Sequence, residues 1–201
     1  MKHILLVEDE SGHAELIRRA LPCVPTDCTL TVVSNLAQAE AYLSKNTPTL
    51  ALVDFRLPDG SGARLVERAA GAFPVVLMTA YGSERGAVEA IKAGALDYIV
   101  KSPESFADMP HVVERALREW EHLQERRRAD HRLEQINRAL LGLGHDFVDN
   151  VNRLTALGGE LLGARFALYS RIEDETMVGV GRWRVPEGFP DALSKKGSLC
   201  E

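Results

Sequence analysis

Five short apolar runs alternate with segments of helical spacing over about the first half of the chain. The runs cover residues 3–7, 28–33, 50–53, 74–78 and 95–100. Four of them are nearly continuous in Val, Ile and Leu, as expected for strands that are covered on both faces. This alternation predicts an α/β fold, in which a parallel sheet of five strands carries helices on both faces.

The intervening segments carry helical patterns and helix-end residues. One apolar helix face includes Ala14, Ile17 and Leu21, and a second helix is expected after Ser34-Asn35, which can cap it. Two more helices are predicted over residues 61–72 and 84–93, the last with Gly94 as its C-cap.

Polar groups follow four of the predicted strands. They are Glu8, Asp9 and Glu10 after the first strand, Asp54 after the third, Thr79 and Ala80 at the fourth, and Lys101 after the fifth. Ligand sites in open parallel sheets lie at this carboxyl edge, so we expect these groups to meet there. Crowded carboxylates raise one another's pKa, and a divalent cation such as Mg²⁺ removes that cost. A metal, a nucleophilic carboxylate, an amine and a hydroxyl favour phosphoryl transfer.

These residues resemble a known family. Glu8-Asp9, Asp54 in the segment 53–60 (Val-Asp-Phe-Arg-Leu-Pro-Asp-Gly), Thr79-Ala80 and Lys101 are similar to the landmarks of the response-regulator receiver domain of two-component signalling. The resemblance implies a flavodoxin-like fold with a five-stranded parallel sheet in the order 2-1-3-4-5. It also implies that Asp54 takes a phosphoryl group from a phosphohistidine on a histidine kinase or phosphotransfer protein.

The resemblance also implies roles for the neighbouring residues. Asp9, Asp54 and the backbone carbonyl of Arg56 would hold Mg²⁺, with Glu8 acting directly or through water. The phosphoryl-binding and switch residues would be Thr79, Ala80, Lys101 and Tyr98. In this set Lys101 pairs with the phosphoryl oxygens, Thr79 reorients to hydrogen-bond them, and Tyr98 swings inward as Thr79 moves.

Two departures from the family pattern carry their own expectations. Family members often have a proline after the lysine, preceded by a cis bond, whereas Ser102 follows Lys101 here. We nevertheless expect a cis Lys101–Ser102 bond, although this isomer costs a non-proline residue about 2.5–4 kcal/mol. Arg56 and Tyr81 could crowd the path of hydrolytic water, so the hypothesis is slow self-dephosphorylation.

A long helix is predicted after the sheet. No Gly or Pro interrupts residues 112–141, and apolar side chains keep helical spacing there. Its first half should pack on the receiver as the fifth helix. Its second half repeats apolar residues at Leu133, Ile136, Leu140 and Leu143, which favours a parallel coiled coil with a second copy. We therefore expect a homodimer, formed through this helix and through the face of helix four, strand five and helix five.

The last part of the chain resembles the beginning of a GAF sensor domain. The resembling residues are Asn152-Arg153-Leu154-Thr155, Gly163-Ala164, Ala167-Leu168-Tyr169 and Gly181-Arg182-Trp183. A helix that ends at Gly163 and two strands over residues 165–172 and 177–183 are predicted, a small α+β fragment too short for a complete pocket. The expected organisation is a receiver core (1–107), a signalling helix (108–143) and a partial GAF-like segment (144–201).

Composition excludes several kinds of partner. The net charge of −5 argues against broad contact with nucleic-acid phosphates, which needs a basic patch. No apolar run reaches the ~18 to 20 residues of a membrane span. Without a signal-peptide pattern, and with an odd count of three cysteines, the chain is expected to be cytoplasmic with reduced thiols.

Other functions compete with a phosphoacceptor that is not itself an enzyme. The chain could be a fragment of a hybrid sensor histidine kinase. An aspartyl-phosphate phosphatase of the haloacid-dehalogenase kind would need an acid two residues after the nucleophile, where Arg56 stands. A phosphorylation-independent scaffold would not need the complete set of site residues.

Overall fold

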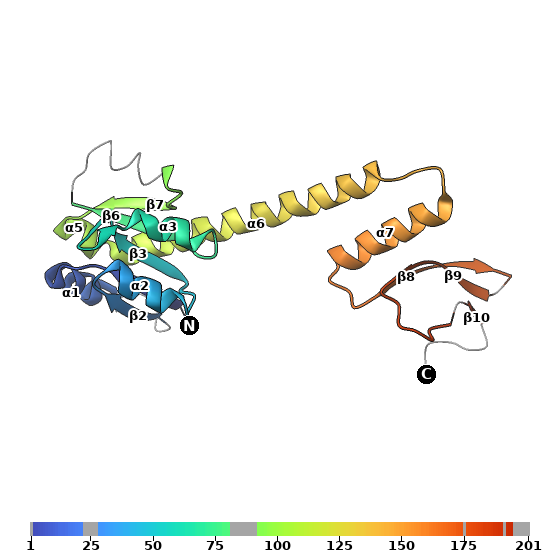
Figure 1. Ribbon diagram of the computed structural model, residues 1–201, viewed down its shortest axis with the longest axis horizontal. Helices are drawn as coiled ribbons and strands as arrows, with labels where there is room; N and C mark the ends of the chain where they lie inside the picture. The colour runs from blue at the N-terminus through green and yellow to red at the C-terminus, as the bar shows by residue number, and fades with distance from the viewer. Residues whose placement is uncertain (1, 22–27, 81–91, 175, 191, 195–201) are drawn as a thin grey trace. The chain divides into compact units, whose positions relative to one another are not determined.

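The computed structural model describes residues 2–21, 28–80, 92–174, 176–190 and 192–194 (Figure 1). The chain forms two compact units, Met1–Gln124 and Glu125–Glu201. The predicted helix over residues 84–93 lies largely outside the described residues, and so does Tyr81. The predicted division at residues 107 and 143 stays a prediction.

The first unit is built on a parallel sheet of five strands. They are β1 (Lys2–Val7), β2 (Cys28–Val33), β3 (Leu50–Asp54), β6 (Val75–Thr79) and β7 (Asp97–Val100). Their order is β2-β1-β3-β6-β7, and every neighbouring pair is parallel. The predicted strand order 2-1-3-4-5 is therefore confirmed.

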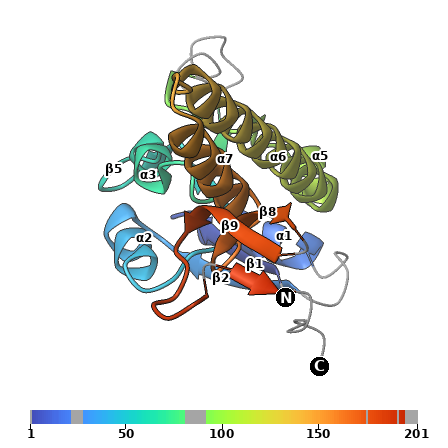
Figure 2. The same cartoon turned by 90° about the vertical axis from the view of Figure 1, so that its right-hand side faces the viewer.

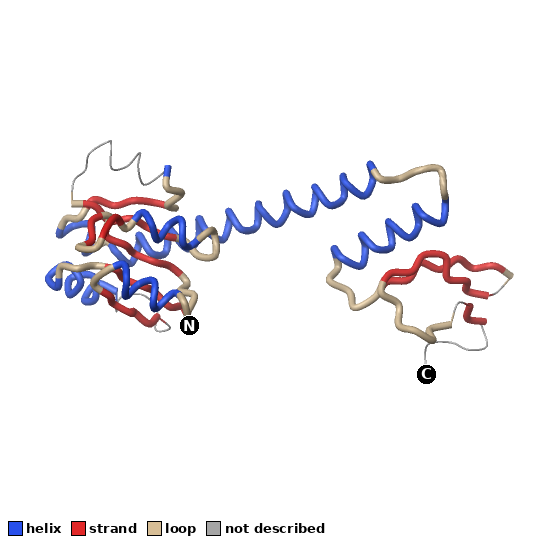
Figure 3. The backbone as a smooth tube through the Cα atoms, in the orientation of Figure 1, coloured by secondary structure: helices blue, strands red, loops and turns tan. Residues whose placement is uncertain are grey.

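Helices cover both faces of this sheet (Figures 2 and 3). The described helices of the first unit are α1 (Ser11–Ala20), α2 (Leu36–Leu43), α3 (Ala63–Ala69), α5 (Pro103–Ala107) and α6 (Met109–Leu141). Side chains of a strand alternate between the two faces. Ile4 of β1 accordingly packs in the core with α1 and α6, while Leu5 packs in a second core with α2 and α3.

The helix α6 is continuous over 33 residues, as the absence of internal Gly and Pro predicted. Only the part near its start contributes fully buried side chains, which are Met109, Val112, Val113 and Ala116. The remainder of the helix runs on into the second unit, whose first residue is Glu125.

The structure departs from the sequence expectations after Lys101. The Lys101–Ser102 bond is trans, so the expected cis bond is wrong. Ser102 instead starts the short helix α5 in an extended conformation, with φ −152°. Its side chain accepts from the Ser105 N–H, while its own N–H donates to the Ser105 hydroxyl. This reciprocal cap starts the helix directly after the strand without the cost of a cis bond.

The third predicted helix is also shorter than expected. Residues 56–61 form a small hairpin from β4 (Arg56–Leu57) and β5 (Gly60–Ser61), and α3 begins only after it. The helix ends at Ala69, and its C-cap Ala70 has a left-handed φ of 45°.

The second unit is a helix packed on an antiparallel sheet. Its elements after α6 are α7 (Phe147–Leu161), β8 (Ala167–Glu173), β9 (Thr176–Trp183) and β10 (Ala192–Ser194), with strand order β10-β9-β8. Gly159 of α7 lies against Trp183, where an added Cβ would come within 2.4 Å of the indole ring. The predicted helix and two strands are confirmed, while β10 was not predicted. Across the described part of the chain, no helix combines the length and apolarity that a membrane crossing requires.

Candidate functional site

The carboxyl edge of the sheet brings two acids and one amine from three strands together. Glu8 follows β1, Asp54 ends β3, and Lys101 follows β7. The side chains of Glu8, Lys101 and Asp54 are 0, 6 and 10 % exposed, respectively. Backbone bonds prolong the sheet to these positions, since the Glu8 N–H donates to the Val33 carbonyl (3.0 Å) and the Lys101 N–H to the Thr79 carbonyl (2.7 Å).

Lys101 bridges the two buried carboxylates. Its Nζ lies 2.5 Å from Asp54 Oδ2 and 2.7 Å from Glu8 Oε2. Burial raises the pKa of Glu8, and the Lys101 ammonium opposes that rise without cancelling it. Burial by itself lowers the pKa of Lys101, but the hydrogen bonds to Asp54 and Glu8 outweigh it, so the pKa of Lys101 is raised. The buried cation is therefore firmly charged at neutral pH.

A third carboxylate makes this edge suitable for a cation. Carboxylate oxygens of Glu8, Asp9 and Asp54 lie within 4.8 Å of one another, and Asp9 is exposed to solvent. One lysine offsets only part of their combined negative charge. Hard oxygen donors with an exposed side, where water or phosphate can complete the coordination, fit Mg²⁺.

The loop after Asp54 folds back onto the acceptor. The Arg56 N–H donates to Asp54 Oδ1 at 3.1 Å. Gly62 closes the loop, because its N–H donates to the Phe55 carbonyl at 2.9 Å. A Cβ at Gly62 would lie 2.0 Å from the Asp54 carbonyl oxygen, so this close approach requires glycine.

The other predicted site residues occupy the same part of the fold. Thr79 ends β6, is half-buried, and pairs in register with Val100 of β7. Ala80 follows it and is exposed. Tyr98 of β7 is half-buried against the core that contains α2 and α3. The Arg56 side chain is exposed.

Two contacts made by acidic side chains near the carboxyl edge of the sheet were not predicted from the sequence. His13 of α1 places Nδ1 3.1 Å from Glu10 Oε2 and 3.6 Å from Glu8 Oε1. The spacing of three residues between Glu10 and His13 at the start of a helix could have indicated this contact. The second contact joins Asp59 to the N-terminus of α2, and no local pattern indicates a partner that far away in sequence.

The family model described as the response regulator receiver domain matches residues 4–114, more than half of the chain. The chain belongs to this family. A curated relative, the methanogenesis regulatory protein FilR1 of Methanothrix harundinacea, is 36 % identical over 129 residues, which cover 61 % of this chain and 29 % of that protein. The response regulator protein PilR of Pseudomonas aeruginosa is 37 % identical over 117 residues, covering 57 % of this chain and 26 % of PilR. The chain thus spans less than a third of the length of these two relatives.

Solved receiver structures agree with the fold. The Mn²⁺-bound form of response regulator Rcp1 is 26 % identical with a TM-score of 0.51, and the match covers 57 % of this chain and 92 % of that one. The phosphorylated cyanobacterial phytochrome response regulator RcpA is 27 % identical with a TM-score of 0.53, and the match covers 58 % of this chain and 94 % of that one.

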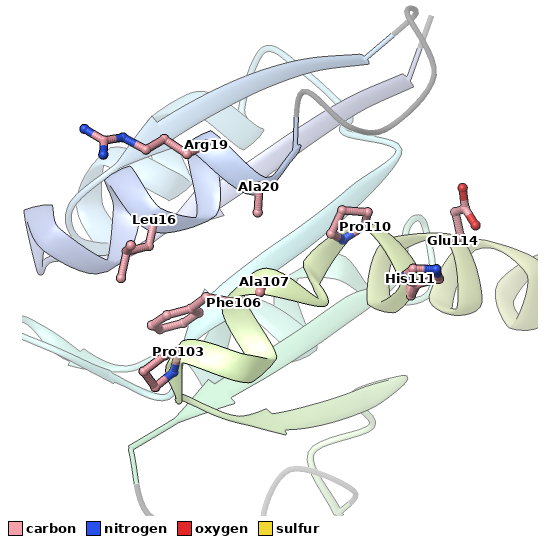
Figure 4. A pocket seen from close by; sticks show the side chains of 9 residues that line it. All are labelled: Leu16, Arg19, Ala20, Pro103, Phe106, Ala107, Pro110, His111 and Glu114. Carbon is pink, nitrogen blue, oxygen red and sulfur yellow. The ribbon is translucent and has the colours of Figure 1, made fainter.

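An apolar groove lies on the α1 face of the receiver, apart from the acidic edge (Figure 4). Its volume is about 580 Å³, and its walls come from α1, α5 and the start of α6, with Leu16, Phe106 and Pro110 among the lining side chains. Phe106 also contacts the His13 ring, with centroids 5.0 Å apart. None of the three clustered carboxylates lines this groove.

Proposed function

We propose that Asp54 accepts a phosphoryl group from a phosphohistidine on a partner histidine kinase or phosphotransfer protein. The buried Lys101 bridge between Asp54 and Glu8 is the observation that carries this proposal. A purely structural ion pair would need only one acid beside Lys101. Here Glu8 and Asp54 both contact Lys101 and Asp9 lies beside them, so the site retains excess negative charge that favours a further cation. The similar response regulator RcpA has been solved in a phosphorylated form, which supports phosphorylation of this chain as well.

The transfer is a nucleophilic displacement at phosphorus. An Asp54 carboxylate oxygen forms the new P–O bond as the P–N bond to the histidine breaks, and the electron pair returns to the imidazole nitrogen. Lys101 is already within hydrogen-bond reach of that carboxylate and supplies a cation for the phosphoryl oxygens. Positioning and neutralisation of charge are the main contributions a protein makes to such a transfer.

The chain's hard oxygen donors support a Mg²⁺ requirement. Asp9, Asp54 and the backbone carbonyl of Arg56 would hold the ion, with Glu8 acting directly or through water. When bound, Mg²⁺ neutralises charge on the transferred oxygens. The existence of an Mn²⁺-bound form of the similar response regulator Rcp1 supports the binding of a divalent cation.

Thr79 and Tyr98 are proposed to report phosphorylation to the rest of the domain, with Ala80 beside the phosphoryl group. The backbone of Tyr98 is tied to α6 through one carboxylate. The Tyr98 N–H donates to Asp97 Oδ1 at 2.8 Å, and Asp97 Oδ2 accepts from Arg115 of α6 at 2.6 Å. This connection supports a route from β7 to the long helix. Arg56 and Tyr81 are further proposed to slow hydrolysis of the aspartyl phosphate.

The output is proposed to act through association of two copies and through the second unit, which we interpret as GAF-like. Leu133 and Leu140 of α6 are 58 and 51 % exposed and stand seven residues apart, as one position of a heptad does. Leu133→Arg combined with Leu140→Arg should abolish dimers seen by light scattering while leaving phosphorylation of Asp54 intact. A dimer that survives both substitutions would reject this interface.

One experiment tests the central proposal. Wild type and Asp54→Asn are incubated with Mg²⁺ and acetyl phosphate or beryllofluoride, and intact mass and oligomeric state are measured. A stable adduct in wild type that is absent from Asp54→Asn supports the phosphoacceptor. Rapid turnover of a phosphate ester supports a phosphatase, and no response in wild type supports a scaffold.

A further inference from the structure

The hairpin that follows the phosphoacceptor caps a helix that precedes it in the sequence. Asp59, at the hairpin turn, accepts the Leu36 N–H at Oδ1 (2.9 Å) and the Ala37 N–H at Oδ2 (3.0 Å). The local cap residue Asn35 accepts only the third donor, the Gln38 N–H, at 2.8 Å. Two of the first three amides of α2 are therefore satisfied by a residue 22 or more positions away.

The hairpin turn also packs on the same end of α2. Gly60 has φ +148°, and a Cβ built there would lie 3.0 Å from Leu36 Cδ1. Leu36 is almost fully buried. The hydrogen bond from the Leu36 N–H lowers the pKa of Asp59, so the carboxylate stays charged and bound to α2 across the neutral range. The turn is thus fixed by charge and by close contact.

The other end of this hairpin reaches the phosphoacceptor. The Arg56 N–H donates to Asp54 Oδ1, and the Arg56 carbonyl is the backbone group assigned above to Mg²⁺. The two strands of the hairpin have two residues each, and a ribbon this short does not hold its conformation without outside contacts. The arrangement at Arg56 therefore depends on where the turn is anchored.

We propose that Asp59 is a positioning residue for phosphoacceptance: by binding the N-terminus of α2, it holds the Arg56 segment in the arrangement that receives the divalent cation. The proposal rests on the proposed function of Asp54. When the anchor is lost, the hairpin spends part of its time in other arrangements. The apparent Mg²⁺ dissociation constant then rises by the reciprocal of the fraction that stays competent.

The competing explanation is that Asp59 only stabilises α2. Asn35 provides the matched control because it caps the same helix turn, and within the described part of the chain its side chain has no hydrogen bond to the hairpin. Asn35→Ala and Asp59→Ala both remove caps of α2, whereas only Asp59→Ala releases the hairpin. A purely structural role predicts equal effects of the two variants on the Mg²⁺ affinity.

The test is a Mg²⁺ titration of the full chain, read by calorimetry and by the amide chemical shifts of Phe55 and Arg56. Asp59→Ala should raise the dissociation constant about three- to tenfold, the range equivalent to the loss of a helix cap. Asn35→Ala should leave it within about twofold of wild type. Asp59→Asn keeps one acceptor oxygen and should lie between wild type and Asp59→Ala, and it replaces Asp59→Ala if that variant does not fold.

Equal dissociation constants for wild type and the Asp59 variants, or equal increases for Asn35→Ala and Asp59→Ala, would overturn the proposal. Acetyl phosphate is added at the end of each titration, and the intact mass is measured. A wild type that binds Mg²⁺ but gains no mass would count against Asp54 as acceptor. The comparison of Mg²⁺ affinities would still decide the role of Asp59.

Discussion

Lys101→Met should destabilise the receiver strongly in the absence of divalent cations. The substitution leaves the Glu8 side chain, 0 % exposed, and the Asp54 side chain, 10 % exposed, facing each other without the ammonium that now lies 2.7 and 2.5 Å away. Removing one partner of a buried ion pair costs about 3–5 kcal/mol, because the remaining charge is uncompensated. The expected loss of unfolding free energy in a chelator at neutral pH is in that range.

The Arg115–Asp97 pair supplies a matched control. Its N–O distance is 2.6 Å, but its side chains are 56 and 25 % exposed. Exposed pairs contribute about 0–1 kcal/mol, since water and salt screen them. Arg115→Met should therefore cost much less than Lys101→Met, although the two pairs have nearly the same length.

The destabilisation by Lys101→Met should also depend on pH. Burial raises the pKa of Glu8 in the folded protein above its ordinary value of 4.5, and Lys101 opposes this rise. An acid with a raised folded pKa gives its full stabilisation below the unfolded pKa and loses it as the pH rises through the folded pKa. Removing Lys101 raises the pKa of Glu8 further. The difference between the variant and wild type should therefore be small at about pH 4.5 and grow towards pH 7.5.

Hydrogen exchange of peptides from β1 and β3 measures this stability in the first unit alone. All of β3 and residues 4–7 of β1 are buried in the sheet, so the slowest amides of these strands report opening of the whole core. The reasoning would be refuted if Lys101→Met lost no more stability than Arg115→Met, or if its loss were equal at both pH values.

The remaining predictions concern the same edge of the sheet. Gly62→Ala should lower the free energy of unfolding in urea by about 3 kcal/mol or more, because the added Cβ would overlap the Asp54 carbonyl. The control Gly12→Ala, which has open space around it in α1, should be neutral or stabilising by up to about 1 kcal/mol. Glu8→Gln should raise the thermal midpoint in a chelator at neutral pH, because burial disfavours the Glu8 charge despite Lys101 and the lysine keeps Asp54 as its partner. The same variant should weaken Mg²⁺ binding in calorimetry, and a lower midpoint would contradict the reasoning. Arg56→Ala should shorten the lifetime of the aspartyl phosphate, measured by intact mass after acetyl phosphate is removed, and an unchanged lifetime would reject its shielding role.

The fold was largely predictable because its main signals are local and repeated. Each buried strand is an apolar run, and each described helix of the first unit apart from α5 has an apolar face, so the layered arrangement follows from patterns a few residues long. The elements that escaped prediction are too short for any period. The helix α5 has five residues and the strands of the β4–β5 hairpin have two each, and tertiary contacts rather than propensity determine them.

The site divides in the same way. Glu8, Asp9, Asp54 and Lys101 could be assigned from the sequence because a topological rule gathers strand ends, whatever the intervening residues are. Asp59 could not be assigned to the N-terminus of α2, since its partners lie in a helix 22 or more positions earlier in the sequence and a lone acid before a glycine is typical of many turns. The trans bond after Lys101 also escaped prediction. It accompanies the reciprocal cap between Ser102 and Ser105 at the start of α5.

The two units differ in the source of their stability. In the receiver, large apolar side chains fill a core on each face of the sheet. Among the described residues of the second unit, the buried positions are small ones, Thr155, Gly159 and Gly181, while Leu162 and Ile172 are 84 and 73 % exposed. The second unit therefore buries less apolar surface than the receiver core and gains less free energy from it, while these exposed side chains offer apolar area to a further surface. The proposed association of two copies through α6 would bring such a surface close to this sheet only if the second copy reaches it, so Leu162→Ser and Ile172→Ser should weaken dimers less than the α6 substitutions if α6 alone forms the interface.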